Sequence, residues 1–194
     1  LDWPTVKLPA GDNLFGWADM VMLQLETPLA LNVEAAHRAA KSGVPVILDP
    51  APASADLPDE LIRRVTIISP NETELALLTG MPVTNVDEAA NAARALLERG
   101  AKTVVVKLGE KGALWLDHDQ QLYMPGNKVD AVDTTAAGDA FTGALAVGLA
   151  EGLDTSDALR RACLVGALAC TRLGAQPSIP RLADVDRFMA SIHT

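Results

Sequence analysis

The sequence lacks the features on which membrane proteins and nucleic-acid-binding proteins depend. It contains no run approaching the roughly 18 consecutive apolar residues of a transmembrane helix, and no charged-then-apolar leader that ends in a cleavage site. Its 16 Lys and Arg are outnumbered by 25 Asp and Glu, which gives a net charge of −9, and no basic cluster is present to neutralise nucleic-acid phosphates. We therefore expect a cytoplasmic protein that binds neither a membrane nor a nucleic acid.

Cysteine is also scarce. Cys163 and Cys170 are the only two, and they fall on one expected helix. Their spacing puts them about 10 Å apart along the helix axis, which is too far for a disulfide. No His or third Cys stands nearby at the spacing of metal ligands. We interpret both as core thiols.

What the sequence does contain is a strong alternation of strand and helix patterns. Hydrophobic residues make up 49% of the chain, enough for one domain with a sizeable core. Strand, helix and strand in succession favour parallel pairing, so the pattern predicts an α/β fold. The expected strands are 18–25, 44–48, 65–68, 103–106 and a hairpin of 112–116 with 121–124; the expected helices are 33–42, 57–64, 72–78, 87–99, 136–151, 156–172 and 182–192.

The most informative segment is DTTAAGDAF at 133–141. Ala136, Ala137 and Gly138 should form the first turn of a helix, where backbone N–H groups lack intrahelical acceptors and small side chains let an anion approach. Asp139 in the same turn should stay ionised and accept a proton from an attacking hydroxyl. The segment therefore indicates phosphoryl transfer. A tight turn followed by an acidic partner of the helix dipole is the alternative explanation.

Two further polar segments follow expected strands, where an open α/β sheet places its ligands. Asn71 and Glu74 share one face of a helix start, where an amide and a carboxylate can orient hydrated Mg²⁺ beside phosphates. Alternatively, Asn71 caps the helix and Glu74 completes a capping box. The turn 107–112 can pass close to a nucleotide, or can simply enter the hairpin. We interpret 48–53 as a rigid strand exit.

Together these segments resemble the ribokinase family of sugar kinases, also called the phosphofructokinase B family, from about Asp19 to the C-terminus. Members carry NPAPA, NxxE, TLGxxG and DTxAAGDxF motifs, and here stand DPAPA at 49–53, NETE at 71–74, KLGEKG at 107–112 and DTTAAGDAF at 133–141. The resemblance implies a three-layer α/β/α ribokinase-like fold with a mostly parallel central sheet, as a single domain over 1–194. The segment 171–180 looks like the ribokinase ending, which favours ribose as substrate.

The resemblance also implies roles for individual residues. Asp139 matches the catalytic base beside the sugar, Ala136, Ala137 and Gly138 match the anion hole for the γ-phosphate, and Glu26 matches a carboxylate near the sugar. Positions matching contacts to ATP and Mg²⁺ are Asn71, Glu74, Lys107, Leu108, Gly109, Glu110, Lys111, Gly112, Gly138 and Cys163. Positions matching a K⁺ site built mostly from backbone oxygens are Asp133, Thr135, Ala169, Arg172, Gly174 and Ser178.

Three departures from the family pattern stand out. Asp49 replaces the usual Asn, and Lys107 replaces the usual Thr, where it adds a positive charge near ATP phosphates or is solvated at the strand end. Leu1 begins where the family's opening strands, lid and sugar-binding glycine-rich segment should already have passed. Because the reacting hydroxyl would not be held, we expect weak or absent activity from these residues alone. The full-length parent is expected to phosphorylate ribose, and is a candidate homodimer.

Several other functions stay open. The chain is also compatible with a nucleotide-binding regulatory or structural module that has no turnover. A fructokinase, a ketodeoxygluconate kinase or a nucleoside kinase remains within the same resemblance. A dinucleotide-dependent oxidoreductase is disfavoured, because no GxGxxG follows a strand with an acidic residue about 20 positions on.

Overall fold

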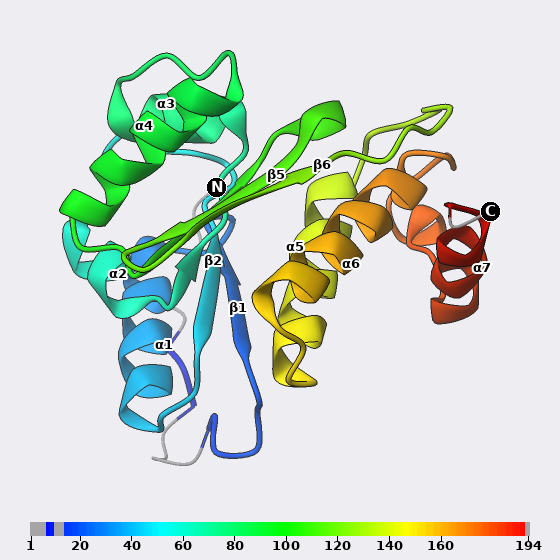
Figure 1. Cartoon of the computed structure of the whole chain (residues 1–194). Helices are drawn as coiled ribbons and strands as arrows, with labels where there is room; N and C mark the ends of the chain where they lie inside the picture. Colours follow the sequence, from blue (N-terminus) through cyan, green and yellow to red (C-terminus); the bar gives the residue numbers. More distant parts are fainter. Residues whose placement is uncertain (1–6, 10–13, 193–194) are drawn as a thin grey trace. The chain divides into compact units, whose positions relative to one another are not determined.

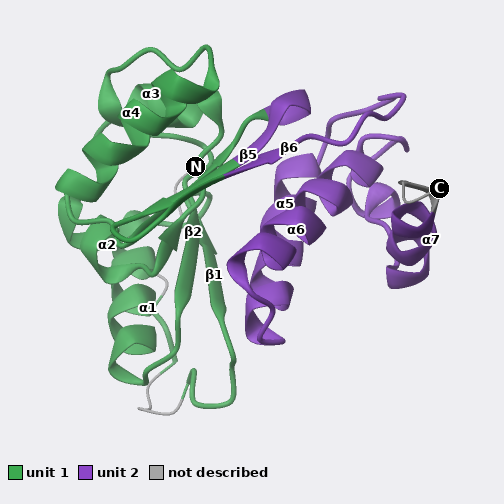
Figure 2. Cartoon of the chain, viewed as in Figure 1, with its two compact units in different colours: residues 1–108, 114–122 green, residues 109–113, 123–194 purple. Residues whose placement is uncertain are grey.

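The computed structural model describes residues 7–9 and 14–192 (Figure 1). The chain divides into two compact units, which are described separately (Figure 2). Unit 1 comprises Leu1–Leu108 and Leu114–Leu122, and unit 2 comprises Gly109–Ala113 and Tyr123–Thr194. The single domain expected over 1–194 stays a prediction.

The sheet has six strands whose spatial order follows the chain order. The first four strands are parallel, with Val21 opposite Val46, Ile47 opposite Ile67, and Ile68 opposite Val104. Helical connections between them allow this, because parallel strands need a long crossover. The predicted α/β fold with a mostly parallel sheet is confirmed. The strands are β1 Val21–Gln24, β2 Val46–Asp49, β3 Ile67–Ile68, β4 Thr103–Lys107, β5 Gly112–Asp117 and β6 Gln121–Pro125.

All seven expected helices are present, with ends shifted by a few residues. The first begins at Leu29 rather than Val33, directly after its N-cap Pro28, which has a non-helical ψ of 131°. The strand expected at 65–68 is reduced to two residues, Ile67 and Ile68. The helices are α1 Leu29–Lys41, α2 Asp59–Arg64, α3 Glu72–Thr79, α4 Val86–Glu98, α5 Ala137–Ala150, α6 Thr155–Ala169 and α7 Leu182–Ile192, with short 3₁₀ turns at Gly109–Lys111 and Gln176–Ser178.

The core of unit 1 lies between the parallel strands and the helices that follow them. Ile47, Leu48, Ile68 and Val104 are fully buried, and successive residues of β2 and β4 are buried on both faces, as expected for covered parallel strands. Leu75 of α3 belongs to the same cluster. This packing fixes the carboxyl ends of β2, β3 and β4, from which three of the expected site segments start.

Unit 2 depends on close packing of α5 against α6. A Cβ on Gly166 of α6 would lie 3.3 Å from the carbonyl oxygen of Ala137 and 3.4 Å from Phe141 Cβ, so the helices approach closely there. Val185 of α7 packs with Ala140 and Leu164 in a small apolar cluster. The low content of bulky side chains in α5 is explained by this approach. Within the ranges that the structure describes, no helix is both long and apolar enough to cross a membrane.

Candidate functional site

The start of α3 is held by a reciprocal pair of hydrogen bonds between Asn71 and Glu74. Asn71 Oδ1 accepts a hydrogen bond of 2.8 Å from the Glu74 N–H, and Glu74 Oε2 accepts one of 2.7 Å from the Asn71 N–H. Asn71 Nδ2 also donates to Glu74 Oε1 over 2.8 Å. The capping box anticipated as an alternative is confirmed. Each carboxylate oxygen still has a further lone pair, so capping leaves Glu74 able to interact with hydrated ligands.

Glu74 is a buried acid in a charged setting. It is 8% exposed, and burial is the main cause that raises its pKa above the usual value. The backbone hydrogen bond from Asn71 and the nearby charge of Lys107 lower the pKa, whereas the charge of Asp49 raises it. Glu74, Asp49 and Lys107 therefore act on one another electrostatically at the carboxyl edge of the sheet.

The two departures from the family pattern, Asp49 and Lys107, contact each other. Lys107 Nζ lies 2.5 Å from Asp49 Oδ2, and the two side chains are only 12% and 4% exposed. The expectation that Lys107 might be solvated at the strand end is wrong, because its ammonium is buried against Asp49 at the end of β2. Its main-chain N–H donates to Pro70 O over 2.8 Å, and Lys107 forms a parallel bridge with Asn71.

The two glycines of the turn 107–112, Gly109 and Gly112, lie in different surroundings. A Cβ on Gly112, at φ +104°, would lie 2.0 Å from Met124 O, and one on Gly126 would lie 2.1 Å from Glu110 O. Packing within the hairpin entry thus explains Gly112 without a ligand. Gly109, at φ +55°, has open space where a Cβ would stand. Of the two, Gly109 is the one that leaves room for an approaching group.

The start of α5 has no side-chain cap, whereas the starts of three other helices do. Asn71, Asn85 and Asp154 cap α3, α4 and α6 with side-chain oxygens, but α5 begins after Ala136, which has no side chain able to cap and adopts a left-handed φ of 60°. The helix starts at Ala137, one residue later than predicted, and exposed Asp139 lies in its first turn as predicted.

Asp133 anchors the segment that precedes α5. Its Oδ1 accepts hydrogen bonds from the Thr135 N–H at 2.9 Å and the Thr135 hydroxyl at 2.6 Å, and its Oδ2 accepts one from the Gly174 N–H at 2.9 Å. These bonds lower the pKa of Asp133 to about 2, with the Thr135 hydroxyl as the largest cause. Main-chain N–H groups of Val132 and Asp133 also donate to Cys170 O. Asp133, Thr135 and Gly174 are therefore brought together, and their role in a K⁺ site stays a prediction.

The remaining expected K⁺ positions lie at the end of α6 and along the stretch that follows it. Ser178 is fully buried and its hydroxyl donates to Ala175 O over 2.7 Å, and the Arg172 N–H donates to Ala169 O over 3.5 Å. In the part of the chain that the structure describes, no three His, Cys, Asp or Glu side chains gather in a way that could hold a metal.

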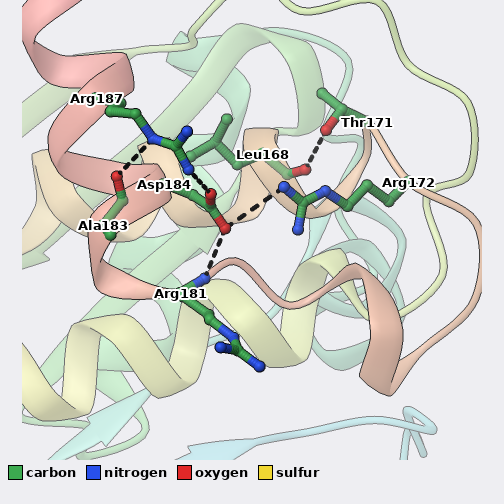
Figure 3. Close-up of polar contacts among 7 residues, drawn as sticks. All are labelled: Leu168, Thr171, Arg172, Arg181, Ala183, Asp184 and Arg187. Carbon is green, nitrogen blue, oxygen red and sulfur yellow. Dashed lines mark hydrogen bonds and ion pairs between the residues drawn. The ribbon is translucent and has the colours of Figure 1, made fainter.

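Arg172 takes part in a surface cluster that joins this stretch to α7 (Figure 3). Its guanidinium lies 3.4 Å from Asp184 Oδ2, while Arg187 contacts Asp184 Oδ1 over 2.5 Å. The Arg181 N–H also donates to Asp184 over 3.2 Å. The side chain of Arg172 is thus engaged by α7, which leaves only its backbone for the expected role.

Two further residues with expected roles at the site, Glu26 and Cys163, differ in their exposure to solvent. Glu26 is exposed in the turn after β1. Cys163 is buried within α6, and burial raises the pKa of its thiol to about 12, so it is neutral and suited to packing. Their roles at a site stay predictions.

One buried polar residue near Glu26 was missed by sequence reasoning. Asn32 of α1 is 2% exposed; it donates to Gln24 O over 2.8 Å and accepts from the Thr27 hydroxyl over 3.2 Å. It thereby fixes the turn between β1 and α1. No local signal marks it, since a single Asn in an amphipathic helix resembles any solvent-facing residue.

Comparisons with known proteins agree on one group of relatives. A family model described as pfkB family carbohydrate kinase matches residues 12–182. The deoxyribokinase of Salmonella typhi is 39% identical over 171 residues, which cover 88% of this chain and 56% of that protein. The ribokinase of Arabidopsis thaliana is 40% identical over 182 residues, covering 92% and 48% respectively.

Solved structures give the same picture. The structure of Arabidopsis thaliana ribokinase complexed with ribose and ATP is similar with a TM-score of 0.89 and 36% identity, over 96% of this chain and 61% of that one. The chain spans about half the length of the curated relatives that it matches.

Proposed function

The chain belongs to the pfkB family of carbohydrate kinases, and from this premise we propose that its full-length protein transfers the γ-phosphate of ATP to a sugar hydroxyl. The first candidate for the acceptor is the 5-hydroxyl of ribose. The single observation that carries the proposal is the uncapped start of α5, where Asp139 stands in the first turn and only small side chains precede it.

Asp139 is proposed as the base. A carboxylate in the first turn of a helix is favoured by the positive end of the dipole, and Asp139 is exposed to an incoming substrate. It would take the proton of the sugar hydroxyl as that oxygen attacks the γ-phosphorus, while the bond from phosphorus to the leaving ADP oxygen breaks. The same carboxylate would orient the sugar by accepting a hydrogen bond from the reacting hydroxyl.

The backbone at 136–138 is proposed as the anion hole. Backbone N–H groups at a helix start point outward and stabilise negative charge. Such groups contribute most when they are fixed before the reaction, because no reorganisation is then required. The left-handed Ala136 and the bonds between Asp133 and its partners supply that fixed geometry.

Asn71 and Glu74 are proposed to orient the nucleotide phosphates through water and Mg²⁺, and the turn 107–112 to lie along ATP. A bound Mg²⁺ would supply neutralising charge on the phosphates. A carboxylate and an amide fixed by a capping box suit this use, because oxygen ligands held rigidly favour a hard cation. Glu26 is proposed to lie near the sugar.

The segments holding Asp133, Thr135, Ala169, Arg172, Gly174 and Ser178 are proposed to bind K⁺ through backbone oxygens. Support comes from the convergence of 133–135 with 170–174. K⁺ would supply a fixed positive charge there. A homodimer of the full-length protein stays a prediction of the family resemblance.

Besides ribose, one other sugar is a specific candidate for the acceptor. The similarity to a deoxyribokinase favours 2-deoxyribose as a second candidate acceptor. The two sugars differ by one hydroxyl, so a site that hydrogen-bonds the 2-hydroxyl should reject deoxyribose strongly, whereas an apolar site discriminates weakly. The substrate is therefore decided by a ratio of kcat/KM values.

The test is sugar-dependent release of ADP by the full-length protein in K⁺ and Na⁺ buffers. The panel contains ribose, 2-deoxyribose, fructose, 2-keto-3-deoxygluconate and a nucleoside, with Asp139→Asn as the control variant. We expect a pentose to give the highest kcat/KM. Tight ATP binding without ADP release for any acceptor would instead indicate a nucleotide-binding module and refute the proposal.

A further inference from the structure

The ion pair between Asp49 and Lys107 joins two strands that are not neighbours. Asp49 is the last residue of β2 and Lys107 the last of β4, with β3 lying between them. β3 has only two residues. Few β-ladder hydrogen bonds therefore fix the chain that follows β3. The Asp49–Lys107 ion pair spans the sheet at this short strand.

Lys107 is the residue at which three segments meet. Its side chain contacts Asp49, its N–H donates to Pro70 O, and its backbone pairs with Asn71. On the other side of this short connection, the Ser69 N–H donates to Leu48 O over 2.8 Å. The position of the α3 start thus depends directly on where Lys107 lies.

The pair also sets the charge around Glu74. Asp49 and Lys107 both act on the Glu74 carboxyl, and the formal charges of the three side chains sum to −1. Without Asp49, the ammonium of Lys107 would lose its ion-pair partner while still attracting the Glu74 carboxylate, and it would compete with Asn71 for that carboxylate. Without Lys107, two buried carboxylates would repel each other.

Stability alone does not explain a pair of this kind. Removing two charges from water is costly, and apolar residues of similar size often stabilise a fold as well or better. A buried pair is better explained where a particular geometry is needed. The geometry needed here is that of Asn71 and Glu74.

We propose that Asp49 and Lys107 form one positioning unit, in which Asp49 holds the Lys107 ammonium away from Glu74 and so keeps the Glu74 carboxylate in place against Asn71. The proposal rests on the proposed function, since it assigns the unit to the nucleotide end of that site. This positioning role is additional to the proposed placement of the turn 107–112 along ATP.

The test is a double-mutant cycle in the full-length protein with Asp49→Asn, Lys107→Thr and the double variant. The single variants change the local charge from −1 to 0 and to −2, and the double variant restores −1. We expect each single variant to raise the KM for ATP at least about tenfold through misplacement of Glu74. The double variant should return that KM to within about threefold of wild type, with the KM for the sugar little changed throughout.

Arg99 and Asp59 provide the matched control. They form another partly buried ion pair of unit 1, at 2.8 Å, and Arg99 also donates to Leu78 O and Leu57 O. Arg99→Met should lower the melting temperature and leave the KM for ATP unchanged. The proposal would be overturned if the single variants at Asp49 and Lys107 also lowered the melting temperature without changing the KM for ATP. It would also be overturned if the fold increases in KM of the two single variants multiplied in the double variant.

Two readouts separate this proposal from the proposed function. The affinity for ATP, measured by calorimetry for each variant of the double-mutant cycle, tests the positioning role even if no sugar is phosphorylated. A crystal structure of Asp49→Asn needs no ligand at all, and should show Lys107 Nζ moved to Glu74 and the capping box broken. An unmoved Lys107 with an intact capping box would refute the positioning role, whatever the enzyme assay shows.

Discussion

The Asp133 carboxylate accepts a hydrogen bond of 2.9 Å from the Gly174 N–H, although the two residues are 41 positions apart. Its other oxygen accepts two bonds from Thr135. One side chain therefore holds the segment that leads into α5 against the segment that follows α6. This connection makes the geometry of the proposed anion hole sensitive to a single charge.

We predict a stability step at acid pH that belongs to Asp133. Its folded pKa is lowered from 3.8 to about 2, so its stabilising contribution is complete above the unfolded pKa and is lost as the pH falls from about 4 to about 2. Asp133→Asn should lower the melting temperature at pH 7, and the difference from wild type should shrink toward pH 2. Thermal unfolding monitored between these pH values measures it.

Exposed Asp130 gives the control for that prediction. Asp130→Asn removes the same charge three residues earlier, and should leave the melting temperature close to wild type at every pH. An equal effect of both variants would mean that net charge, rather than the bonds to Thr135 and Gly174, accounts for the acid step.

Asp139→Asn should abolish most turnover while leaving nucleotide binding intact. Loss of a general base costs typically about 10²- to 10⁴-fold in kcat, and an exposed first-turn residue can be replaced by its amide without disturbing the core. ADP release and calorimetric binding of Mg-ATP measure the two properties. A variant that kept more than a tenth of wild-type kcat would remove Asp139 from the role of base.

Asn71→Ala and Asn85→Ala should destabilise the protein equally but differ in binding. Both are helix N-caps, with Oδ1 accepting from the N–H of Glu74 or of Glu88, so each substitution should cost about 1 kcal/mol. Only Asn71→Ala should weaken Mg-ATP binding, because it also releases Glu74. Urea unfolding and calorimetry compare them, and equal binding losses would contradict a site at α3.

Ala136→Gly should stabilise the protein by about 1 kcal/mol, because a left-handed conformation costs a non-glycine residue about that much. The gain is limited by the greater freedom of glycine in the unfolded chain. Ala167→Gly, in the last turn of α6, should instead lose stability, by up to about 1 kcal/mol. Denaturant unfolding compares the two variants, and a loss of stability in Ala136→Gly would show that φ 60° is not strained here.

Gly126→Ala should disrupt the entry to the hairpin. Its Cβ would stand 2.1 Å from Glu110 O, a backbone atom that cannot yield easily. Gly143→Ala is the matched change in open space, since nothing lies within 4 Å of a Cβ there, and it should stabilise α5 by up to about 1 kcal/mol. Melting temperatures that fall together would contradict the steric account.

Much of the fold was predictable from local patterns. The apolar, β-branched residues of β4 indicated a covered parallel strand, and the glycine at 80 marked the end of α3, where it adopts a left-handed φ of 69°. These features depend on residues close in sequence, so a linear reading finds them. The shortening of β3 to Ile67–Ile68 was not predictable, because ladder bonding depends on where both neighbouring strands end.

The candidate site was likewise predictable from the sequence only in part. The sequence by itself determined which residues follow the strands and open the helices: Asn71 and Glu74 at α3, and Asp139 in the first turn of α5. It did not determine that α5 lacks a side-chain cap, because it placed Ala136 inside the helix, whereas the structure places Ala136 just before the first helical residue.

Only the tertiary structure decided which of these residues are joined. Asp49 and Lys107 looked like two unrelated departures from a motif, and only the family resemblance linked Asp133 with Gly174, until the fold brought each pair into contact. The physical reason is that a charge or a hydrogen bond acts over a few ångströms of space. For residues far apart in the sequence, the partner is therefore fixed by how strands and helices pack.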